Sequence, residues 1–235
     1  MKLDILQALN EERRARRAAV LVTDLASGAQ RLAKAADIAA DPMAELIDRQ
    51  LRMGKSASVE HEGKTYFLTV QAPPARLVVI GAVHVSQTLG QMARMLDFDV
   101  TIVDPRTAFA SEERFPDVRV IAEWPDKTLP EIGLDRYTAV AALTHDPKID
   151  DPALKLALAA ECFYIGALGS KKTHAKRVER LSAAGFSDAQ IGRIHAPIGL
   201  DIGAVSPAEI AVSVLAEIVL SLRRKPLRAE KEKAA

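Results

Sequence analysis

The sequence predicts an α/β protein in which a doubly wound parallel sheet follows a small α+β domain. From residue 76 onward, short continuous apolar runs rich in β-branched residues alternate with stretches of helical periodicity, as expected for strands covered on both faces. Before that point the pattern differs, with two helical stretches and a hairpin. The 235 residues suffice for one good core and a small second one, since domains usually have roughly 100 to 150 residues.

The first domain is expected at residues 1–75. Leu3, Leu6 and Leu9 lie near helical spacing among charged residues. The segment Ala72-Pro73-Pro74 breaks the pattern in the manner of a linker. In order, the predicted elements are a helix over 2–17, a strand over 18–23, a turn at Ser27-Gly28, a helix from Asp41-Pro42 to Gly54, and hairpin arms over 57–60 and 65–70 that join at Glu62-Gly63.

The doubly wound domain is expected at residues 76–223. Its first strand leads into a helix that places Val85, Leu89, Met92 and Leu96 on one side. The Lys/Glu-rich residues 224–235 are predicted to form a disordered tail. The predicted strands cover 77–81, 100–104, 118–122, 139–144 and 163–165, and the later helices cover 152–160, 172–183 and 207–223.

Charge and cysteine content exclude several classes of protein. Lys and Arg number 32 against 31 for Asp and Glu, so the net field offers no general attraction to nucleic acid or to an anionic membrane. The single cysteine, Cys162, excludes an intramolecular disulfide and a cysteine-cluster metal site. No apolar run approaches the roughly 20 residues of a membrane span, and the run from Ala18 to Val22 is too short for a signal-peptide core. The sequence therefore predicts a cytoplasmic protein without nucleic-acid or membrane partners.

The candidate site lies at the strand ends, because ligands of open α/β sheets bind beyond the carboxyl ends of the strands. The first end, Gly81 to Ser86, occupies the place of a dinucleotide-binding fingerprint but keeps only its first glycine. Val83 stands where a glycine normally lets the backbone approach a pyrophosphate. His84 begins the next helix, where it could approach a phosphate, cap the helix or pack in the core.

The second strand end is Asp104-Pro105-Arg106. Asp104 lies 23 positions after Gly81, close to the spacing of an acid that binds a ribose. Arg106 could pair with a phosphate through two parallel hydrogen bonds. The alternative is an acid that caps a turn beside a surface arginine.

The third strand end carries Thr144, His145 and Asp146, with further carboxylates shortly after. A histidine flanked by carboxylates at such a place could move a proton or hold a metal ion or an anion. We expect Asp151 to cap a helix that begins at Pro152, which removes one carboxylate from that account.

The fourth strand end runs from Gly166 to Lys172. Gly166 and Gly169 permit a tight loop with inward N–H groups, and the helix that begins after Ser170 offers its positive end. Two lysines add positive charge. These three features favour a phosphate cradle, and the alternative is a glycine turn before a solvated basic helix.

The segment from Ala196 to Gly203 contains two glycines and a carboxylate and lies directly before the predicted start of a helix. Ser206 and Glu209 form a capping box around Pro207. The segment suits a ligand, and the alternative is a well-made turn before a core helix. Its candidate residues are Pro197, Gly199, Asp201 and Gly203.

Six segments in the same order carry a resemblance to a known family. They are Gly81-Ala82-Val83-His84-Val85, Val103-Asp104-Pro105-Arg106, Arg114-Phe115-Pro116, Leu143-Thr144-His145-Asp146, Tyr164 to Ser170, and His195 to Gly203 running into Ser206 to Glu217. Over residues 77–222 the chain resembles the C-terminal Rossmann domain of the xanthine dehydrogenase accessory proteins, the XdhC/CoxI family.

The resemblance implies a Rossmann-like fold and a chaperone rather than an enzyme. Such a protein binds molybdenum cofactor, protects it, supports its sulfuration through a cysteine desulfurase and helps to insert it into a xanthine-dehydrogenase-type apoenzyme. Glycine loops, helix N-termini and Asp or His side chains suit the phosphate and the pterin edges of molybdopterin. The predicted cofactor-binding residues are Gly81, His84, Asp104, Arg106, Thr144, His145, Asp146, Gly166, Gly169, Ser170, Pro197, Gly199, Asp201 and Gly203.

The chain departs from the family pattern in two places. Val83 and Ser86 replace the later glycines of the usual Gly-Ala-Gly-His-Val-Gly segment. Residues 1–75 lack the Gly-Ser-Ser-Pro-Arg-like segment and the Ser-Gly-Gly-Cys-x-Glu motif usual in the N-terminal domain. We therefore expect a short member, working with a separate chain that supplies the missing half.

Two other functions stay open at this point. Strand order, Asp104 and His145 favour an NAD(P)-dependent oxidoreductase, which Val83 opposes. The eroded glycine motif favours a regulatory or scaffold protein that has lost its ligand. The free sheet edges and the small first domain suggest a homodimer.

Overall fold

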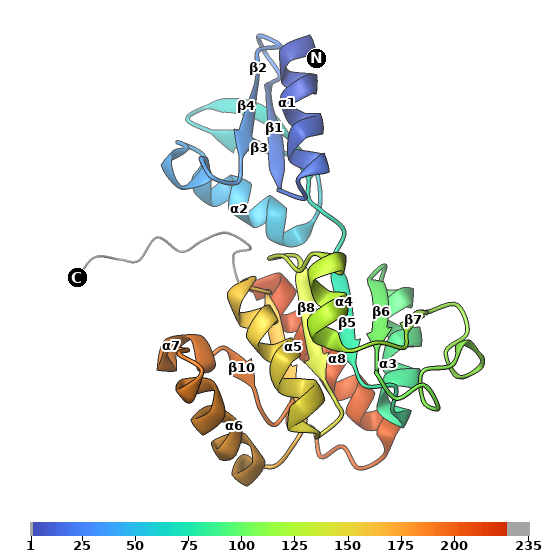
Figure 1. The fold of residues 1–235 in the computed structure, drawn as a ribbon. Helices are drawn as coiled ribbons and strands as arrows, with labels where there is room; N and C mark the ends of the chain where they lie inside the picture. The colour runs from blue at the N-terminus through green and yellow to red at the C-terminus, as the bar shows by residue number, and fades with distance from the viewer. Residues whose placement is uncertain (1, 225–235) are drawn as a thin grey trace. The chain divides into compact units, whose positions relative to one another are not determined.

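The computed structural model describes residues 2–224, which form two compact units (Figure 1). One unit runs to Pro73 and includes the last described residues from Arg223, and the other is Pro74–Leu222. The tail predicted for 224–235 lies, from residue 225 on, outside the described residues.

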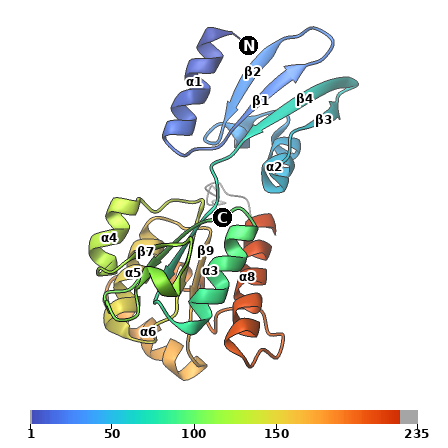
Figure 2. The same ribbon diagram turned by 90° about the vertical axis from the view of Figure 1, so that its right-hand side faces the viewer.

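A four-stranded antiparallel sheet forms the first unit. Its strands are β1 (Ala19–Asp24), β2 (Gln30–Lys34), β3 (Ala57–His61) and β4 (Lys64–Gln71), in the order β2-β1-β4-β3. The helix α1 (Leu3–Arg14) covers one face, and α2 (Ala44–Met53), which follows the short 3-10 helix η1 (Ile38–Ala40), covers the other (Figure 2). The predicted hairpin is confirmed. The strand β2 was not predicted, because its sequence Gln-Arg-Leu-Ala-Lys has no β-branched residue.

The core of this first unit lies between the sheet and α2. Val20 and Val22 of β1 and Leu68 of β4 are buried against Ile47 of α2. Each such side chain stabilises the fold by about 1.5–3 kcal/mol when it is fully buried. Gly54 ends α2 with φ of +65°, a left-handed conformation that glycine adopts without strain.

A six-stranded parallel sheet forms the second unit. Its strands are β5 (Arg76–Ile80), β6 (Asp99–Val103), β7 (Arg119–Ile121), β8 (Thr138–Ala142), β9 (Tyr164–Ala167) and β10 (Ile194–His195), in the order β10-β9-β8-β5-β6-β7. The helices are α3 (His84–Met95), η2 (Glu112–Arg114), α4 (Pro125–Ile132), α5 (Pro147–Ala159), α6 (Lys171–Ala183), α7 (Asp188–Ile191) and α8 (Pro207–Arg224). The predicted α/β fold class, with a Rossmann-like doubly wound sheet and a small α+β part before it, is confirmed.

Helices cover both faces of the parallel sheet. α3 and α8 lie on one face, and α4 and α5 lie on the other with α6 beside α5 (Figure 2). This arrangement explains the continuous apolar runs, since β8 is buried at every position. Within residues 2–224, no helix is both long and apolar enough to cross a membrane.

Two predictions about helix ends are wrong. The helix α5 begins at Pro147, and Asp146 caps it by accepting the Lys148 N–H at 2.9 Å. Asp151 therefore lies inside the helix and pairs with Arg180. The dipeptide Asp-Pro occurs at both 146–147 and 151–152, and each is a valid start signal. Leu96 follows the end of α3 and is 51% exposed, so it does not share the buried side of that helix.

Candidate ligand-binding site

The carboxyl ends of the parallel strands form one edge of the second unit. The chain runs from β5 outward to β6 and β7 on one side, and through β8, β9 and β10 on the other. The strand order therefore reverses between β5 and β8, the place where open α/β sheets bind ligands. The topology brings the four predicted strand ends to this edge of the sheet.

The loop after β5 is closed by contacts within the protein. Gly81 has φ of +111°, and a Cβ atom added there would lie 2.8 Å from Thr144 Cγ2. Ser86, which replaces the third glycine of the fingerprint, is buried and donates its hydroxyl to the Gly81 carbonyl. Val83 is the N-cap of α3, and His84 begins that helix with an exposed side chain. Among the side chains of this loop, that of His84 is the most exposed.

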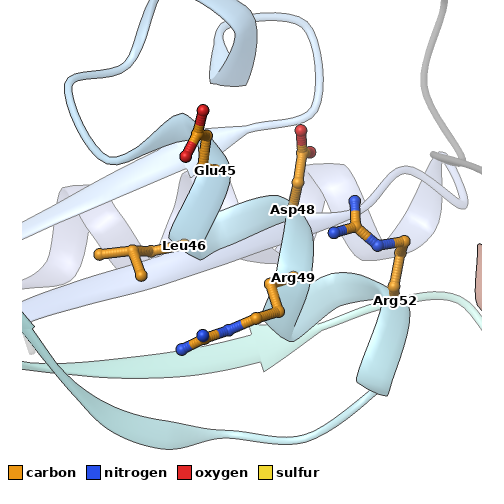
Figure 3. A pocket seen from close by; sticks show the side chains of 5 residues that line it. All are labelled: Glu45, Leu46, Asp48, Arg49 and Arg52. Atoms are coloured by element: carbon orange, nitrogen blue, oxygen red, sulfur yellow. The ribbon is translucent and has the colours of Figure 1, made fainter.

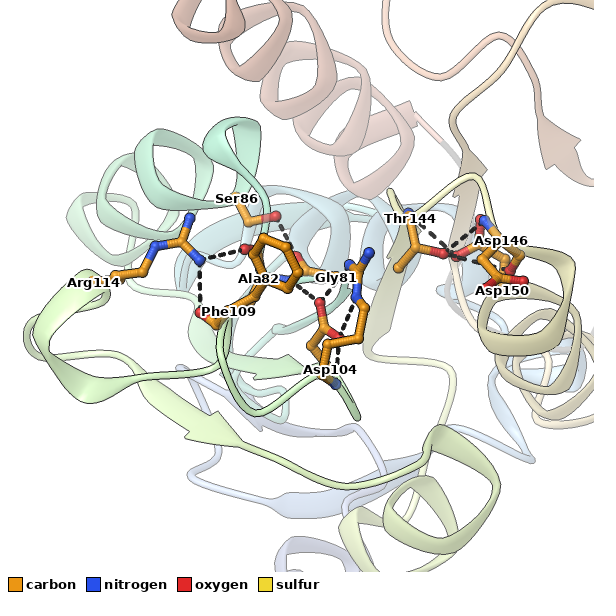
Figure 4. Close-up of polar contacts among 10 residues, drawn as sticks. Gly81, Ala82, Ser86, Asp104, Phe109, Arg114, Thr144, Asp146 and Asp150 are labelled. Atoms are coloured by element: carbon orange, nitrogen blue, oxygen red, sulfur yellow. Dashed lines mark hydrogen bonds and ion pairs between the residues drawn. The ribbon is translucent and has the colours of Figure 1, made fainter.

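Asp104 is fully buried and uses both carboxylate oxygens within the protein (Figure 4). Oδ2 accepts the Ala82 N–H at 2.8 Å and Arg106 Nη2 at 2.7 Å. Oδ1 accepts the backbone N–H and the Nε of Arg106, each at 2.9 Å. Burial opposes ionisation, but the hydrogen bonds from Arg106 and Ala82 outweigh it and lower the pKa of Asp104. An acid held in this way fixes the loop after β5 and has no free oxygen for a ribose hydroxyl.

Arg114 also holds the loop after β5, a role that the sequence did not predict. Its Nη1 donates to the Ala82 carbonyl at 3.0 Å and to the Phe109 carbonyl at 2.8 Å. Its guanidinium lies 5.7 Å from the ring centre of Phe109. The motif Arg114-Phe115-Pro116 was one of the six segments of the family resemblance, but the sequence analysis assigned no role to Arg114.

The loop after β8 is built around Thr144. The Thr144 hydroxyl donates to Asp150 Oδ1 at 2.7 Å and accepts the Asp146 N–H at 3.0 Å. Between them, His145 has φ of +63° and is exposed, a conformation that costs a non-glycine residue free energy and is frequent at functional sites. Asp146 is engaged as the N-cap of α5. Among these predicted residues, His145 is the one presented at the edge of the sheet.

Gly166 and Gly169 have different places in the structure. Gly166 lies within β9, where an added Cβ would come within 2.6 Å of the Tyr164 hydroxyl. Gly169 lies in the following loop with φ of +132°. Ser170 then caps α6 by accepting the Thr173 N–H at 3.2 Å. Gly166 is thus explained by packing, whereas Gly169 shapes the predicted phosphate cradle.

Two buried charged groups lie close to this cradle without full hydrogen bonding. Arg177 is 2% exposed and donates Nη2 to the Leu168 carbonyl at 3.0 Å, and Asp150 is 1% exposed. In residues 2–224, Asp150 Oδ2 and Arg177 Nε have no hydrogen-bond partner. Burial raises the pKa of Asp150 and lowers the pKa of Arg177. An unsatisfied buried polar group costs about 1–3 kcal/mol, so the two mark a place where a further polar group would be favoured.

The segment after β10 is tied to α8. Glu217 of α8 accepts the Gly199 N–H at 2.8 Å, the Tyr164 hydroxyl at 2.7 Å and His195 Nδ1 at 2.8 Å. Burial opposes ionisation of Glu217, but the hydrogen bonds from His195 and Tyr164 outweigh it and lower its pKa. An added Cβ at Gly199 would overlap with Ser213 Oγ. Gly199 is therefore a packing position, and this carboxylate network was not predicted.

The other three candidate residues of that segment are exposed. Pro197, Asp201 and Gly203 all lie at the surface. The predicted capping box is confirmed, because Ser206 N–H donates to Glu209 Oε2 at 2.8 Å and Glu209 N–H donates to Ser206 Oγ at 3.2 Å.

Two further predictions from the sequence concern an inert thiol at Cys162 and a metal site around His145. Cys162 is buried, and burial raises the pKa of its thiol to about 12, which agrees with the predicted inert role. Over residues 2–224, no three His, Cys, Asp or Glu side chains lie together in a way that could bind a metal ion. The protein groups around His145 therefore do not form a metal site by themselves.

A hollow of about 350 Å³ lies on α2 in the first unit (Figure 3). Two acids and two arginines of the same helix surround it, so charges of both signs are mixed along its wall. None of the predicted site residues contributes to this hollow. Its lining residues are Glu45, Leu46, Asp48, Arg49 and Arg52.

A comparison with protein families matches residues 77–218 to the XdhC Rossmann domain. The chain belongs to the XdhC family. The match spans the parallel sheet and most of α8, and it includes every one of the predicted site residues. The resemblance expected from the six sequence segments is therefore confirmed.

Three curated relatives are similar to this XdhC-family chain. A protein of Bacillus subtilis, named as a probable subunit of xanthine dehydrogenase, is 31% identical over 186 residues, which are 78% of this chain and 54% of that protein. The "Molybdenum cofactor insertion chaperone PaoD" of Escherichia coli is 32% identical over 146 residues, 62% of this chain and 40% of that protein. The "Uncharacterized protein YqeB" of Escherichia coli is 32% identical over 157 residues, 65% of this chain and 28% of that protein. The chain thus spans about a quarter to a half of the length of these relatives.

A solved structure has a similar fold. The crystal structure of a xanthine dehydrogenase from Bacillus halodurans matches with a TM-score of 0.66 and 24% identity, over 93% of this chain and 66% of that one. Since the match covers almost all of the chain, it includes the small first unit as well as the parallel sheet. At this identity the likeness concerns the fold.

Proposed function

We propose that this XdhC-family protein binds molybdenum cofactor and helps to insert it into an enzyme of the xanthine dehydrogenase type. The observation that carries the proposal is the family match over residues 77–218. It is supported by a relative named as a molybdenum cofactor insertion chaperone, which is 32% identical to this chain over 146 residues. Delivery of a cofactor requires a site that binds it, and the strand ends described above offer backbone N–H groups and polar side chains for this purpose.

The loop before α6 suits the phosphate of the cofactor. α6 has 13 residues, and the backbone N–H groups of Lys171 and Lys172 at its start have no partner in the part of the chain described. Such groups bind anions because they point at the ligand and carry the positive end of the helix dipole. The side chains of both lysines are exposed beside them. In the proposal, Gly169 and Ser170 shape this cradle.

The buried pair beneath the loop suits the polar edges of a pterin. Asp150 Oδ2 lacks a donor and Arg177 Nε lacks an acceptor among residues 2–224. A pterin ring carries amide and amino groups that offer both. The exposed side chain of His145, at the place where the strand order reverses, would contact the same ligand. His84, which follows the loop after β5, would contact it as well.

Most of the other predicted site residues would act by positioning. Gly81, Asp104 and Thr144 fix the loops after β5, β6 and β8, as the contacts above describe. Arg106 holds Asp104, Asp146 caps α5, and Gly166 and Gly199 permit close packing. Pro197, Asp201 and Gly203 would contact the cargo from the exposed segment after β10.

The molybdenum cofactor is cargo in this proposal, and it supplies redox chemistry only in the client enzyme. The chain's own residues would bind the phosphate and would form hydrogen bonds with the pterin. A cysteine desulfurase and a second copy of the chain stay predictions from the sequence. We further propose the xanthine-dehydrogenase-type apoenzyme as the partner that receives the cofactor.

The experiment is a binding measurement with isolated cofactor. The purified protein is mixed without oxygen with molybdenum cofactor and passed through a gel-filtration column. Molybdenum content and fluorescence of the oxidised pterin are then measured in the protein peak, with and without the client apoenzyme. We expect one pterin per chain, and loss of about tenfold or more in affinity when Lys171→Gln and Lys172→Gln are combined, because two charge-assisted hydrogen bonds are removed.

A matched control is the pair Lys55→Gln and Lys155→Gln. Both lysines are exposed, Lys55 after the end of α2 and Lys155 within α5, and neither lies at the start of a helix after a strand end. The control pair changes net charge by the same amount and should bind as the wild type does. Absence of pterin from the wild-type peak, also in the presence of the apoenzyme, would refute the proposed function.

A further inference from the structure

The helix α8 lies on one face of the parallel sheet (Figure 2) and is apolar on its outer side as well as on its inner side. The inner side, which includes Val214 and Ile218, is buried in the core. Between Ile210 and Leu222 the one charged residue is Glu217, and that carboxylate is used within the protein. A surface helix normally carries charged residues on its outer side, whereas a helix that is apolar all round is normally buried. The outer side of α8 therefore has the composition of a covered surface.

Five residues define this outer side, and we call them the outer stripe of α8. Their spacing alternates between three and four residues, which places them along one side of a helix. Val212 is 49% exposed although it is apolar, and Ala216 and Val219 are partly exposed. These three apolar residues lie between an exposed acid and an exposed arginine. In order, the outer stripe is Glu209, Val212, Ala216, Val219 and Arg223.

The two ends of the outer stripe carry opposite charges that are not used in ion pairs. Glu209 accepts the backbone N–H groups of Val205 and Ser206 with its Oε2 atom, each at 2.8 Å. Arg223 donates Nη1 to the Arg52 carbonyl at 2.9 Å. Among the residues that the structure describes, neither side chain has an ion-pair partner. Both charges can therefore pair with a second molecule.

The outer stripe is complementary to a reversed copy of itself. Ala216 lies seven residues from Glu209 and seven from Arg223, so antiparallel pairing centred on Ala216 places each Glu209 opposite Arg223 of the second copy. A two-fold axis brings the same surface of both copies together in this way. The small side chain of Ala216 permits close approach of the helices, and Val212 and Val219 on either side of it fill the contact. Parallel pairing would instead bring like charges together.

We propose that the outer stripe of α8 is the contact between two copies of this chain, paired antiparallel about Ala216. The sequence suggested a homodimer through free sheet edges, whereas this proposal places the contact on a helix. α8 begins at the carboxyl edge of the parallel sheet, so antiparallel pairing leaves the two strand-end edges at opposite ends of the paired helices. The outer stripe contains none of the candidate ligand-binding residues, and the proposal is therefore independent of the proposed function.

The test is analytical ultracentrifugation of the full chain over a range of protein concentrations. We expect a dimer that dissociates on dilution. Val212→Glu should raise the dissociation constant of the dimer by at least about tenfold, because it buries a charge without a partner between the helices. The matched control is Met95→Glu, at the end of α3 with 83% exposure. This control should form the dimer as the wild type does.

Two further variants test the direction of the pairing. Arg223→Glu brings like charges together at both ends of the contact, so it should weaken the dimer by about fivefold at low salt and by less at high salt. Ala216→Cys should be linked to its copy by a short bifunctional maleimide, whereas Met95→Cys should not. Cys162 does not interfere with this reaction, because it is buried and the pKa of its thiol is raised to about 12.

Two results would overturn the proposal. One is a wild type that stays monomeric at every concentration tested. The other is a dimer that neither Val212→Glu nor Arg223→Glu weakens, because another surface must then form it. Circular dichroism shows whether each variant is folded. If Val212→Glu does not fold, the crosslinking of Ala216→Cys decides, and its failure in a dimeric protein would equally reject pairing about Ala216.

Discussion

Replacing Asp104 by asparagine is the sharpest test of how the strand-end loops are held. Asn has the same shape, so Asp104→Asn opens no cavity. Each carboxylate oxygen accepts two hydrogen bonds, at 2.7–2.9 Å, from Ala82 and Arg106. Whichever way the new amide turns, its NH₂ group faces two donors. The substitution therefore loses two hydrogen bonds and the negative charge.

The cost follows from burial. A buried N–H without an acceptor costs about 1–3 kcal/mol. The side chain of Arg106 is 36% exposed, so water replaces much of its lost ion pair, which adds only about 0–1 kcal/mol. We expect Asp104→Asn to lower the free energy of unfolding by about 1–4 kcal/mol. For a unit of this size the melting temperature should fall by roughly 2–4 °C for each kcal/mol.

Urea unfolding followed by tryptophan fluorescence measures this change. Trp124 is the single tryptophan of the chain, and it lies in the second unit between β7 and α4. The matched control is Asp146→Asn, because Asn and Asp cap a helix about equally well, and its stability should change by less than about 0.5 kcal/mol. Equal stability of both variants would refute the reasoning.

The difference in stability between the wild type and Asp104→Asn should also depend on pH. The pKa of Asp104 is lowered in the folded protein, so its ionised form contributes stability in full above the unfolded value of about 4. That contribution is lost as the pH falls through the folded pKa. The difference in unfolding free energy between wild type and Asp104→Asn should therefore be constant from pH 5 to 8 and shrink below about pH 4.

Two further predictions concern single residues. Gly199→Ala should destabilise the protein by about 2–4 kcal/mol, because φ is +93° and the new Cβ would overlap with Ser213 Oγ. The control Gly203→Ala, at φ of +73° in open space, should cost only about 1 kcal/mol. Thermal melts measure both losses of stability, and equal losses would contradict the role of packing at Gly199. Cys162 should resist a thiol reagent at pH 8 in the folded protein and react after denaturation, since its pKa is raised to about 12 by burial. Fast reaction of the native protein would contradict this.

The parallel sheet and its strand ends were predictable because burial on both faces leaves a local pattern. Runs such as Leu77 to Ile80 are apolar at every position, and a chain alternating such runs with helices has few ways to fold. The capping box of Ser206 and Glu209 is also local, because its partners are three residues apart. Elements with weak local signals, such as β2 and β10, were missed.

The tertiary structure decided which of the predicted residues face a ligand. Asp104 and Arg106 are close in sequence, yet the donor from Ala82 that completes their network comes from 22 residues away. Arg114 reaches the same loop across 32 residues. Asp146 and Asp151 carry the same local signal, and only the packing of α5 beside α6, with Arg180 opposite Asp151, assigns one to a cap and the other to an ion pair.

The sequence by itself determined the fold class, the family and the four candidate strand ends, because these depend on periodicity and on motifs of neighbouring residues. Only the tertiary structure decided that Gly166 and Gly199 are packing positions, that Glu217 joins β9, β10 and α8, and that the guanidinium groups of Arg106 and Arg114 both lie over the ring of Phe109. The physical reason is that a hydrogen bond or a steric contact between distant residues leaves no pattern along the chain.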